Sequence, residues 1–180
     1  MQLKYSLDEK DFLEYQLYSA SKSKNIIKQR RTTFIIIFVA LSLFFYNDYA
    51  ASQSFPYFNF IIYILLLVIY KIYERKRYIN HYKKFIDENN KKALGVICTL
   101  NFTEKYIIEE NNLGESKINY DSITEINEIQ NYFFIKLLTG QSLVFPKNKI
   151  NDMNEFRFKL SEIKDKYNLK ENIELNWKWK

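Results

Sequence analysis

The sequence predicts an α-helical membrane hairpin followed by a small α+β domain. Two long apolar runs, 32–46 and 55–73, indicate the hairpin, and Asp48 is the one charged residue between them. After residue 93 the apolar residues change from helical spacing to short alternating segments, which is typical of β-strands. We therefore expect a membrane part and a folded domain outside the bilayer.

Each apolar run is long enough to cross a bilayer once its aromatic and polar ends lie at head-group depth. A helix needs roughly 20 mostly apolar residues to cross a hydrocarbon core of about 30 Å, and the first run can extend through Ala51 if Asn47 and Asp48 lie at an interface. One alternative is a signal-peptide core in the first run, but Asn47, Asp48 and a second apolar run follow it and it begins far from the N-terminus. The other is two buried helices of a soluble core, but neither run has a polar face. We predict two spans within 32–73, joined by an outer loop at 47–54.

Basic residues flank the outer ends of both runs, and loop 47–54 holds none. Because cytoplasmic flanks collect Lys and Arg, we expect a multi-pass protein of the bacterial inner membrane with both termini in the cytoplasm. The same residues would attract anionic lipids, or would serve only to orient the spans. The basic residues predicted at the membrane surface are Lys28, Arg30, Arg31, Lys71, Arg75, Lys76 and Arg77.

Two further segments adjoin the spans on their cytoplasmic side. Residues 1–31 predict a short strand followed by an amphipathic helix, with Ser6 and Glu9 spaced as a capping box. We expect this segment to dock on the cytoplasmic domain rather than stand alone. Residues 74–92 hold neither Gly nor Pro and predict a basic helical stalk that continues the second span.

Residues 93–170 predict several antiparallel strands closed by one helix. Asp152 and Glu155 are spaced as a helix cap, and an apolar residue recurs every three or four positions from Met153 to Tyr167. This order is typical of a pleckstrin-homology-like (PH-like) domain, an antiparallel sheet or partial barrel capped by one C-terminal helix, and we expect it to fold without the spans. The predicted strands are 94–102, 106–109, 115–120, 123–129, 132–138 and 142–145.

The chain resembles the YcxB-like family, bacterial two-span membrane proteins with a PH-like C-terminal domain. Tyr120 stands where that family commonly has Trp, and this exchange keeps an aromatic ring. The resemblance implies the fold and the membrane location but no biochemical activity. It is carried, in order, by residues 5–12 with Tyr15, the paired spans, the basic stalk, and residues 100–104, 118–123, 132–135 and 143–147.

The sequence lacks the patterns that catalysis requires. Its three glycines form no phosphate-binding loop, and its single Cys and single His form no metal-ligand or nucleophile pattern. We therefore predict a protein that is not an enzyme and binds no cofactor or metal. Residues 93–180 carry 12 basic and 13 acidic residues, a net charge of −1, which argues against nucleic-acid binding by this domain.

The remaining interpretation is a membrane-anchored protein-interaction module, with membrane lipids and one unidentified protein as its partners. The tail 171–180 alternates apolar and polar residues, and we predict Trp177 and Trp179 as partner-binding anchors. The tail could instead pair with its own sheet or rest at the membrane interface. The alternative function is an anionic-lipid-binding module of the membrane surface. An immunity protein that sequesters a toxin and an accessory subunit of an envelope complex are two roles that fit, and the oligomeric state is left open.

Overall fold

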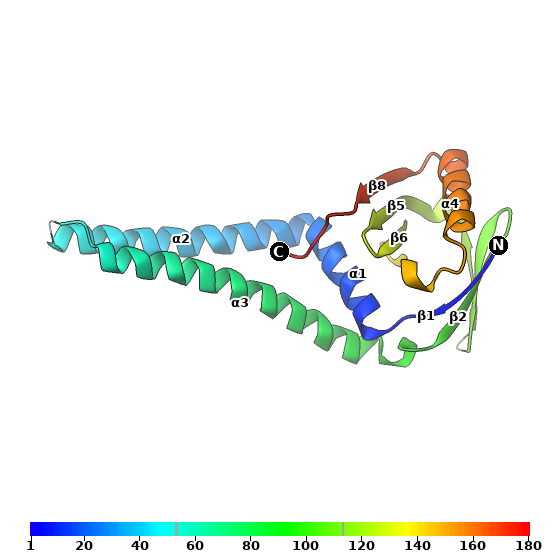
Figure 1. Ribbon diagram of the computed structural model, residues 1–180, viewed down its shortest axis with the longest axis horizontal. Helices are drawn as coiled ribbons and strands as arrows, with labels where there is room; N and C mark the ends of the chain where they lie inside the picture. Colours follow the sequence, from blue (N-terminus) through cyan, green and yellow to red (C-terminus); the bar gives the residue numbers. More distant parts are fainter. Residues whose placement is uncertain (53, 113) are drawn as a thin grey trace. The chain divides into compact units, whose positions relative to one another are not determined.

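The computed structural model describes residues 1–52, 54–112 and 114–180, which divide into two compact units (Figure 1). The first, here called the sheet unit, comprises Met1–Tyr15 and Phe85–Lys178. The second, here called the hairpin unit, comprises Gln16–Lys84 and Trp179–Lys180. The sheet unit is therefore discontinuous in sequence, because the hairpin is inserted between its first 15 residues and the rest.

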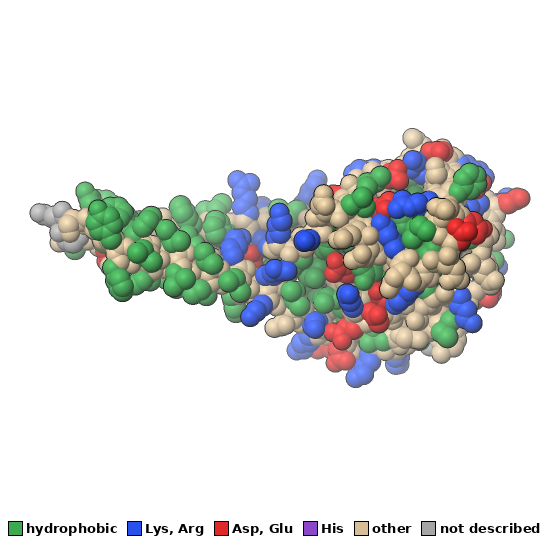
Figure 2. All heavy atoms as spheres, in the orientation of Figure 1, with side chains coloured by type: hydrophobic (Ala, Val, Ile, Leu, Met, Phe, Trp, Pro, Cys, Tyr) green, Lys and Arg blue, Asp and Glu red, His purple; other side chains and the backbone are tan. Residues whose placement is uncertain are grey.

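The hairpin unit is built on two long helices, α2 (Lys24–Ser52) and α3 (Tyr57–Asn89). The last turn of α3 belongs to the sheet unit. Ring contacts at both ends of the pair make the helices antiparallel neighbours: Phe34 lies 6.4 Å from Tyr70, and Phe45 lies 5.7 Å from Phe60. Both helices are long and apolar enough to cross a membrane, by length and composition. Figure 2 shows hydrophobic side chains covering them, with Lys and Arg gathered where the apolar segments end.

Most of the loop expected at 47–54 is helical, since α2 continues to Ser52, and residue 53 of that loop lies outside the described residues. The helix continues past Asp48, which has two hydrogen-bond partners on α3. Its carboxylate accepts hydrogen bonds from Asn59 Nδ2 at 2.9 Å and from the Tyr63 hydroxyl at 2.6 Å. Asp48 thus joins the two helices near their connection.

The sheet unit contains two four-stranded sheets. The first has the order β1-β2-β3-β4 and is antiparallel throughout. The second has the order β7-β6-β5-β8. Their strands are β1 (Gln2–Ser6), β2 (Ile97–Phe102), β3 (Tyr106–Asn111), β4 (Gly114–Asn119), β5 (Ile123–Ile129), β6 (Tyr132–Leu137), β7 (Ser142–Pro146) and β8 (Lys170–Glu174).

The second sheet departs from the expected antiparallel arrangement at β8. This strand crosses the predicted boundary between the domain 93–170 and the tail 171–180. It pairs parallel with β5, with Glu125 opposite Lys170 and Ile129 opposite Glu174. Short 3₁₀ turns occur at Lys91–Ala93, Tyr120–Ser122 and Lys147–Lys149. Tyr120 therefore follows β4 rather than ending it.

One helix, α4 (Met153–Tyr167), closes the core between the sheets. Asp152 caps its N-terminus by accepting a hydrogen bond from Glu155 N at 2.9 Å, as the sequence predicts. Its apolar stripe also lies as predicted: Phe156, Leu160 and Ile163 are buried, and the Phe156 ring contacts rings from three different strands.

The N-terminal segment contributes to the same core. Leu3 and Tyr5 are buried on one face of β1, which pairs antiparallel with β2 so that Leu3 lies opposite Leu100. In Figure 1 β1 lies beside β2, although some 90 residues separate them in sequence. The expectation that this segment docks on the folded domain agrees with this pairing.

The capping box predicted at Ser6 and Glu9 is wrong by two residues. Helix α1 (Glu9–Lys22) is capped reciprocally by Asp8 and Asp11: Asp11 N donates to Asp8 Oδ1 at 3.0 Å, and Asp8 N donates to Asp11 Oδ2 at 2.9 Å. Ser6 is still within β1 and cannot also begin the helix. The residues of each pair, Ser6 with Glu9 and Asp8 with Asp11, are three positions apart, so the sequence spacing fits both. The end of β1 at Ser6 decides between them.

Candidate functional site: the juxtamembrane cluster and the tail strand

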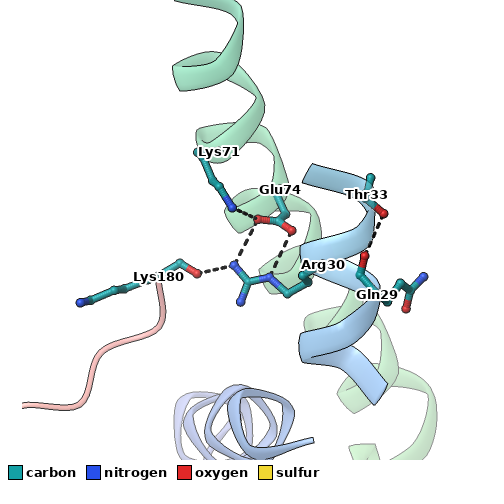
Figure 3. Close-up of polar contacts among 6 residues, drawn as sticks. All are labelled: Gln29, Arg30, Thr33, Lys71, Glu74 and Lys180. Atoms are coloured by element: carbon teal, nitrogen blue, oxygen red, sulfur yellow. Dashed lines mark hydrogen bonds and ion pairs between the residues drawn. The ribbon is translucent and has the colours of Figure 1, made fainter. Parts of the chain in front are cut away.

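The first candidate site lies in the hairpin unit, where the apolar segments of α2 and α3 end. Glu74 on α3 is buried, with a side chain only 6% exposed, and it receives a two-pronged contact from Arg30 on α2 (Figure 3). Arg30 Nε lies 3.1 Å from Glu74 Oε1, and Arg30 Nη2 lies 3.1 Å from Glu74 Oε2. Lys71 Nζ lies 3.3 Å from the same Oε2. A planar guanidinium suits this paired geometry better than a lysine would.

Arg30 also holds the end of the chain in this unit. Its Nη2 donates to the main-chain oxygen of Lys180 at 2.7 Å, and its guanidinium carbon lies 4.7 Å from the centre of the Trp179 ring. The Trp179 ring packs edge-on against Tyr78, with ring centres 5.4 Å apart. Trp179 is 7% exposed, and its buried Nε1 has no hydrogen-bond partner among the described residues.

The structure separates the predicted basic residues into two groups. Arg30 is half-buried and Lys71 joins its ion pair, so these two hold the helices together as well as carrying charge. The other five are exposed at the end of the apolar segments and remain predicted membrane-surface residues: Lys28, Arg31, Arg75, Lys76 and Arg77. Sequence reasoning missed Glu74, a single acid among basic neighbours, because its partner lies 44 residues away.

The second candidate site is the edge of the second sheet, formed by β8. In the parallel pairing, Ile173 lies opposite Glu128 and Asn172 lies opposite Asn127. Asn172 Nδ2 donates to Asn127 Oδ1 at 2.7 Å and to Glu125 Oε2 at 3.2 Å, two side-chain bonds that add to the main-chain pairing over five positions. Because β8 is the outermost strand, its other edge faces outward, and Ile173 and Leu175 are 59% and 48% exposed.

The two tryptophans predicted as partner anchors belong to different units. Trp177 is half-buried in the sheet unit, whereas Trp179 is buried in the hairpin unit. Their role in binding a partner stays a prediction, but the exposed apolar residues of the tail are Ile173 and Leu175. The alternation in the sequence indicated this strand. Its first and last residues could not be predicted, because Lys, Glu and Asn have low β-propensity.

A buried carboxylate fastens α4 and the turn after β7 beside this edge. Glu128 on β5 accepts from Lys147 Nζ at 2.6 Å and from Arg157 Nη1 at 3.0 Å, and both cations lie about 5 Å from the Phe133 ring centre. Burial alone would raise the pKa of Glu128, but the hydrogen bonds from Arg157 and Lys147 outweigh it and hold the pKa below its ordinary value. Glu128 is therefore an ionised anchor.

A similar network ties α1 to the second sheet. The buried Asp11 accepts from Lys149 Nζ at 2.6 Å and from the Tyr132 hydroxyl at 3.0 Å. Burial, followed by the nearby Asp11 charge, raises the pKa of Tyr132 well above its ordinary value. Cys98 is buried, as the sequence predicts, and burial raises the pKa of its thiol to about 12, with a further contribution from Glu109.

The described residues contain no group of three or more His, Cys, Asp or Glu side chains arranged to hold a metal ion. Within the same residues, the buried acids Asp11, Glu74 and Glu128 are each paired with at least one cation. What these networks do chemically is neutralise buried charge and fix one element against another. The exposed basic residues and the β8 edge lie outside these networks and are the two surfaces considered for binding.

These features define a class: a protein with two helices long and apolar enough to span a membrane and an α+β sheet unit that carries one C-terminal helix. The family model described as YcxB-like protein matches residues 102–158, from the end of β2 into α4. The resemblance to the YcxB-like family is thereby confirmed over residues 102–158. No curated protein and no solved structure matches the chain.

Proposed function

We propose that this chain is a non-enzymatic protein-interaction module anchored in the bacterial inner membrane, with β8 as its docking edge. The observation that carries the proposal is an outermost strand with two exposed apolar side chains, Ile173 and Leu175. Addition of a partner strand to such an edge combines main-chain hydrogen bonds with side-chain specificity. An immunity protein that holds a toxin and an accessory subunit of an envelope complex both fit this description.

The outward surface of the two long helices supports the membrane anchor. Large apolar side chains point away from the unit along both helices; Leu43 is 64% exposed on α2 and Ile61 is 65% exposed on α3. Soluble proteins rarely expose contiguous apolar surface of this extent, whereas a lipid-facing helix requires it. The helices would cross the bilayer over their uncharged segments, with Asp48 at the outer interface.

Two independent arguments support a topology with both termini in the cytoplasm. Lys and Arg flank the outer ends of the apolar segments, as expected of cytoplasmic flanks. In addition, β1 precedes the hairpin and β2 follows it, and the two strands pair over five positions. Residues before and after the hairpin must then lie on the same side of the membrane.

The arrangement of the sheet unit supports a PH-like domain. Two sheets of consecutive strands followed by one C-terminal helix match the order that such a domain requires. In this chain β1 extends the first sheet and β8 extends the second, so both additions come from outside residues 93–169. We propose that β8 supplies the docking edge that this unit presents.

Affinity purification in mild detergent tests the proposal. We expect a partner protein to co-purify with the full chain and to be lost with the double substitution Ile173→Ser and Leu175→Ser. The matched control is Phe158→Ser on α4, which removes an apolar side chain that is 72% exposed and does not belong to β8. Equal recovery of the same partner by the two variants would exclude β8 as the docking edge.

The second candidate function, binding of anionic lipid, is favoured by the five basic residues that remain exposed at the ends of the apolar segments. Each Lys or Arg near an anionic membrane surface contributes about 1 kcal/mol of attraction. Purified protein that carries anionic phospholipid and no second protein would favour this function. Exchange of Arg75, Lys76 and Arg77 for Gln should then reduce the bound lipid, whereas the β8 substitutions should not.

A further inference from the structure

We propose that the β8 edge takes the β8 strand of a second copy of this chain, antiparallel and centred on Asn172. This inference rests on the proposed function, since it names the protein that the docking edge binds. It starts from the sequence of the strand, Lys170-Glu171-Asn172-Ile173-Glu174, and from its position at the outside of the sheet.

Backbone geometry restricts how two copies of one strand can pair. Along a strand, the N–H and C=O groups of alternate residues point to opposite sides, so every second residue of β8 bonds toward β5 and the others point outward. Two copies related by a two-fold axis match their outward groups when the axis passes through a residue. An axis between two residues would place the outward N–H and C=O groups of one copy opposite residues of the other copy whose groups point toward β5, so the hydrogen bonds could not form.

Charge selects Asn172 among the residues on which the axis could lie. With the axis at Asn172, Lys170 of each copy faces Glu174 of the other, which makes two opposite-charge pairs. An axis at Glu171 would place two identical carboxylates opposite each other. An axis at Ile173 would place Asn172 opposite Glu174 and would form neither of the Lys–Glu pairs. The strand is therefore complementary to itself in one register.

Apolar exposure distinguishes β8 from β4, one of the two outer strands of the other sheet. Glu115 and Lys117 of β4 could also pair about a two-fold axis, at Ser116, and the charges of both edges already have contacts within their own chain: Lys117 lies 3.5 Å from Glu115, and Lys170 lies 3.9 Å from Glu125. Charge alone therefore does not separate the two edges. The apolar residue of β4, Ile118, is half-buried. Charged edges without apolar side chains are typical of strands protected from pairing. On β8, in contrast, Ile173 would pack beside Glu171 of the other copy, whose methylene groups can cover it.

A five-residue edge is short for a dimer in free solution, where a standard interface buries about 1,600 Å². Two chains anchored in one membrane are confined to a thin layer, and this raises the effective concentration of each edge for the other. The pairing that we propose is therefore a property of the anchored protein, and it should be tested in membranes.

Disulfide crosslinking of the full chain in membrane vesicles tests the register. Antiparallel residues directly opposite each other have Cα atoms about 4.5–5.5 Å apart, within the range that a disulfide bridges. Asn172→Cys should give a disulfide-linked dimer under mild oxidation. Ser116→Cys, on the β4 edge, should give no more dimer than the unsubstituted chain, whose single Cys98 is buried.

Charge exchange in the Asn172→Cys background tests the complementarity. Lys170→Glu alone, or Glu174→Lys alone, turns both attractive pairs into repulsive ones and should lower the dimer yield about tenfold. The double exchange within one chain should restore it. Co-expression of the two single variants should also restore it, because each mixed dimer then contains two opposite-charge pairs.

The outcomes separate this inference from the function on which it rests. A dimer at position 172 that follows the charge exchange supports pairing between copies. The inference is overturned if the dimer yield of Asn172→Cys is no higher than that of Ser116→Cys, or if the charge exchange leaves this yield unchanged. If self-pairing fails while Ile173→Ser with Leu175→Ser still loses a co-purifying protein, the edge binds a different partner and the proposed function stands. Because Cys98 is buried, slow reaction of its thiol with a thiol-modifying reagent checks that each variant is folded.

Discussion

The two units use large apolar side chains in opposite ways. In the sheet unit Phe133, Phe145 and Phe156 are at most 2% exposed, whereas in the hairpin unit Phe38, Phe44 and Phe58 are 51%, 63% and 76% exposed. The sheet unit gains stability by removing rings from water, whereas the hairpin unit leaves these outward-facing rings of its long helices uncovered. The same residue type therefore reports on the solvent for which each unit is built.

The largest expected effect is in the sheet unit, at the centre of the ring cluster. Phe156→Ala should lower the free energy of unfolding of this unit by about 3–5 kcal/mol, because a fully buried ring is replaced by a cavity. Phe158→Ala, two positions along the same helix and 72% exposed, should change it by less than about 0.5 kcal/mol. Denaturant unfolding in detergent, followed by the reactivity of Cys98, measures both variants. Equal losses would mean that α4 does not close the core.

The comparison is sharpened by placing a charge on an exposed apolar position of the hairpin unit. Leu65 is 55% exposed, so in a water-soluble protein Leu65→Asp would be nearly neutral. In a membrane-spanning α3 the same change should oppose insertion by about 3 kcal/mol. The fraction of chain recovered in carbonate-washed membranes measures this effect, with Phe158→Asp in the sheet unit as the control. Full recovery of Leu65→Asp would break the contrast between the units.

The junction of α2 and α3 tests the structural role of one predicted surface residue. Arg30→Ala leaves Glu74 buried with Lys71 as its remaining partner and should destabilise the hairpin unit by about 3 kcal/mol. Arg31→Ala removes the same charge from an exposed neighbour and should have little effect. Fluorescence of Trp179 in a Trp177→Phe background should shift to longer wavelength in the first variant alone. Equal spectra of the Arg30→Ala and Arg31→Ala variants would mean that Arg30 has no structural role beyond its charge.

The smallest expected effect concerns acid stability of the sheet unit. The pKa of Glu128 is lowered from its ordinary value of 4.5, so the unfolded chain binds a proton more readily than the folded one. The stabilisation is complete above about pH 4.5 and is lost as the pH falls through the lowered pKa. Glu128→Gln should therefore flatten the fall of unfolding free energy below pH 4.5, measured by denaturant titration across pH. An unchanged slope would assign acid sensitivity to Asp8 and Glu125, whose pKa values are also lowered.

Local patterns were sufficient to predict much of both units. The helix cap at Asp152 and Glu155 depends on residues three apart, and the strand at Ile123–Ile129 matches its predicted limits. The long helices follow from uninterrupted apolar composition, which requires no knowledge of partners. Features of this kind are encoded within one element.

Features that join distant residues could not be read in the same way. The pairing of Arg30 with Glu74 and of β1 with β2 depends on the fold having already brought the partners together. β8 was obscured because packing against β5 overrides the weak strand preference of its residues. The domain expected at 93–170 therefore needs residues from both of its flanks, and we now expect it to fold only when β1 and β8 are supplied.

The pairing of β1 with β2 has a consequence for the time course of biosynthesis. A ribosome adds about 5–20 residues per second, so β1 waits on the order of 5–20 s before β2 emerges. During that interval both apolar helices leave the ribosome and can enter the bilayer, while Leu3 and Tyr5 still lack the strand that covers them. In the membrane protein that we propose, insertion of the helices precedes completion of the sheet, and a chain that pauses within α3 would hold an unpaired strand at the membrane surface.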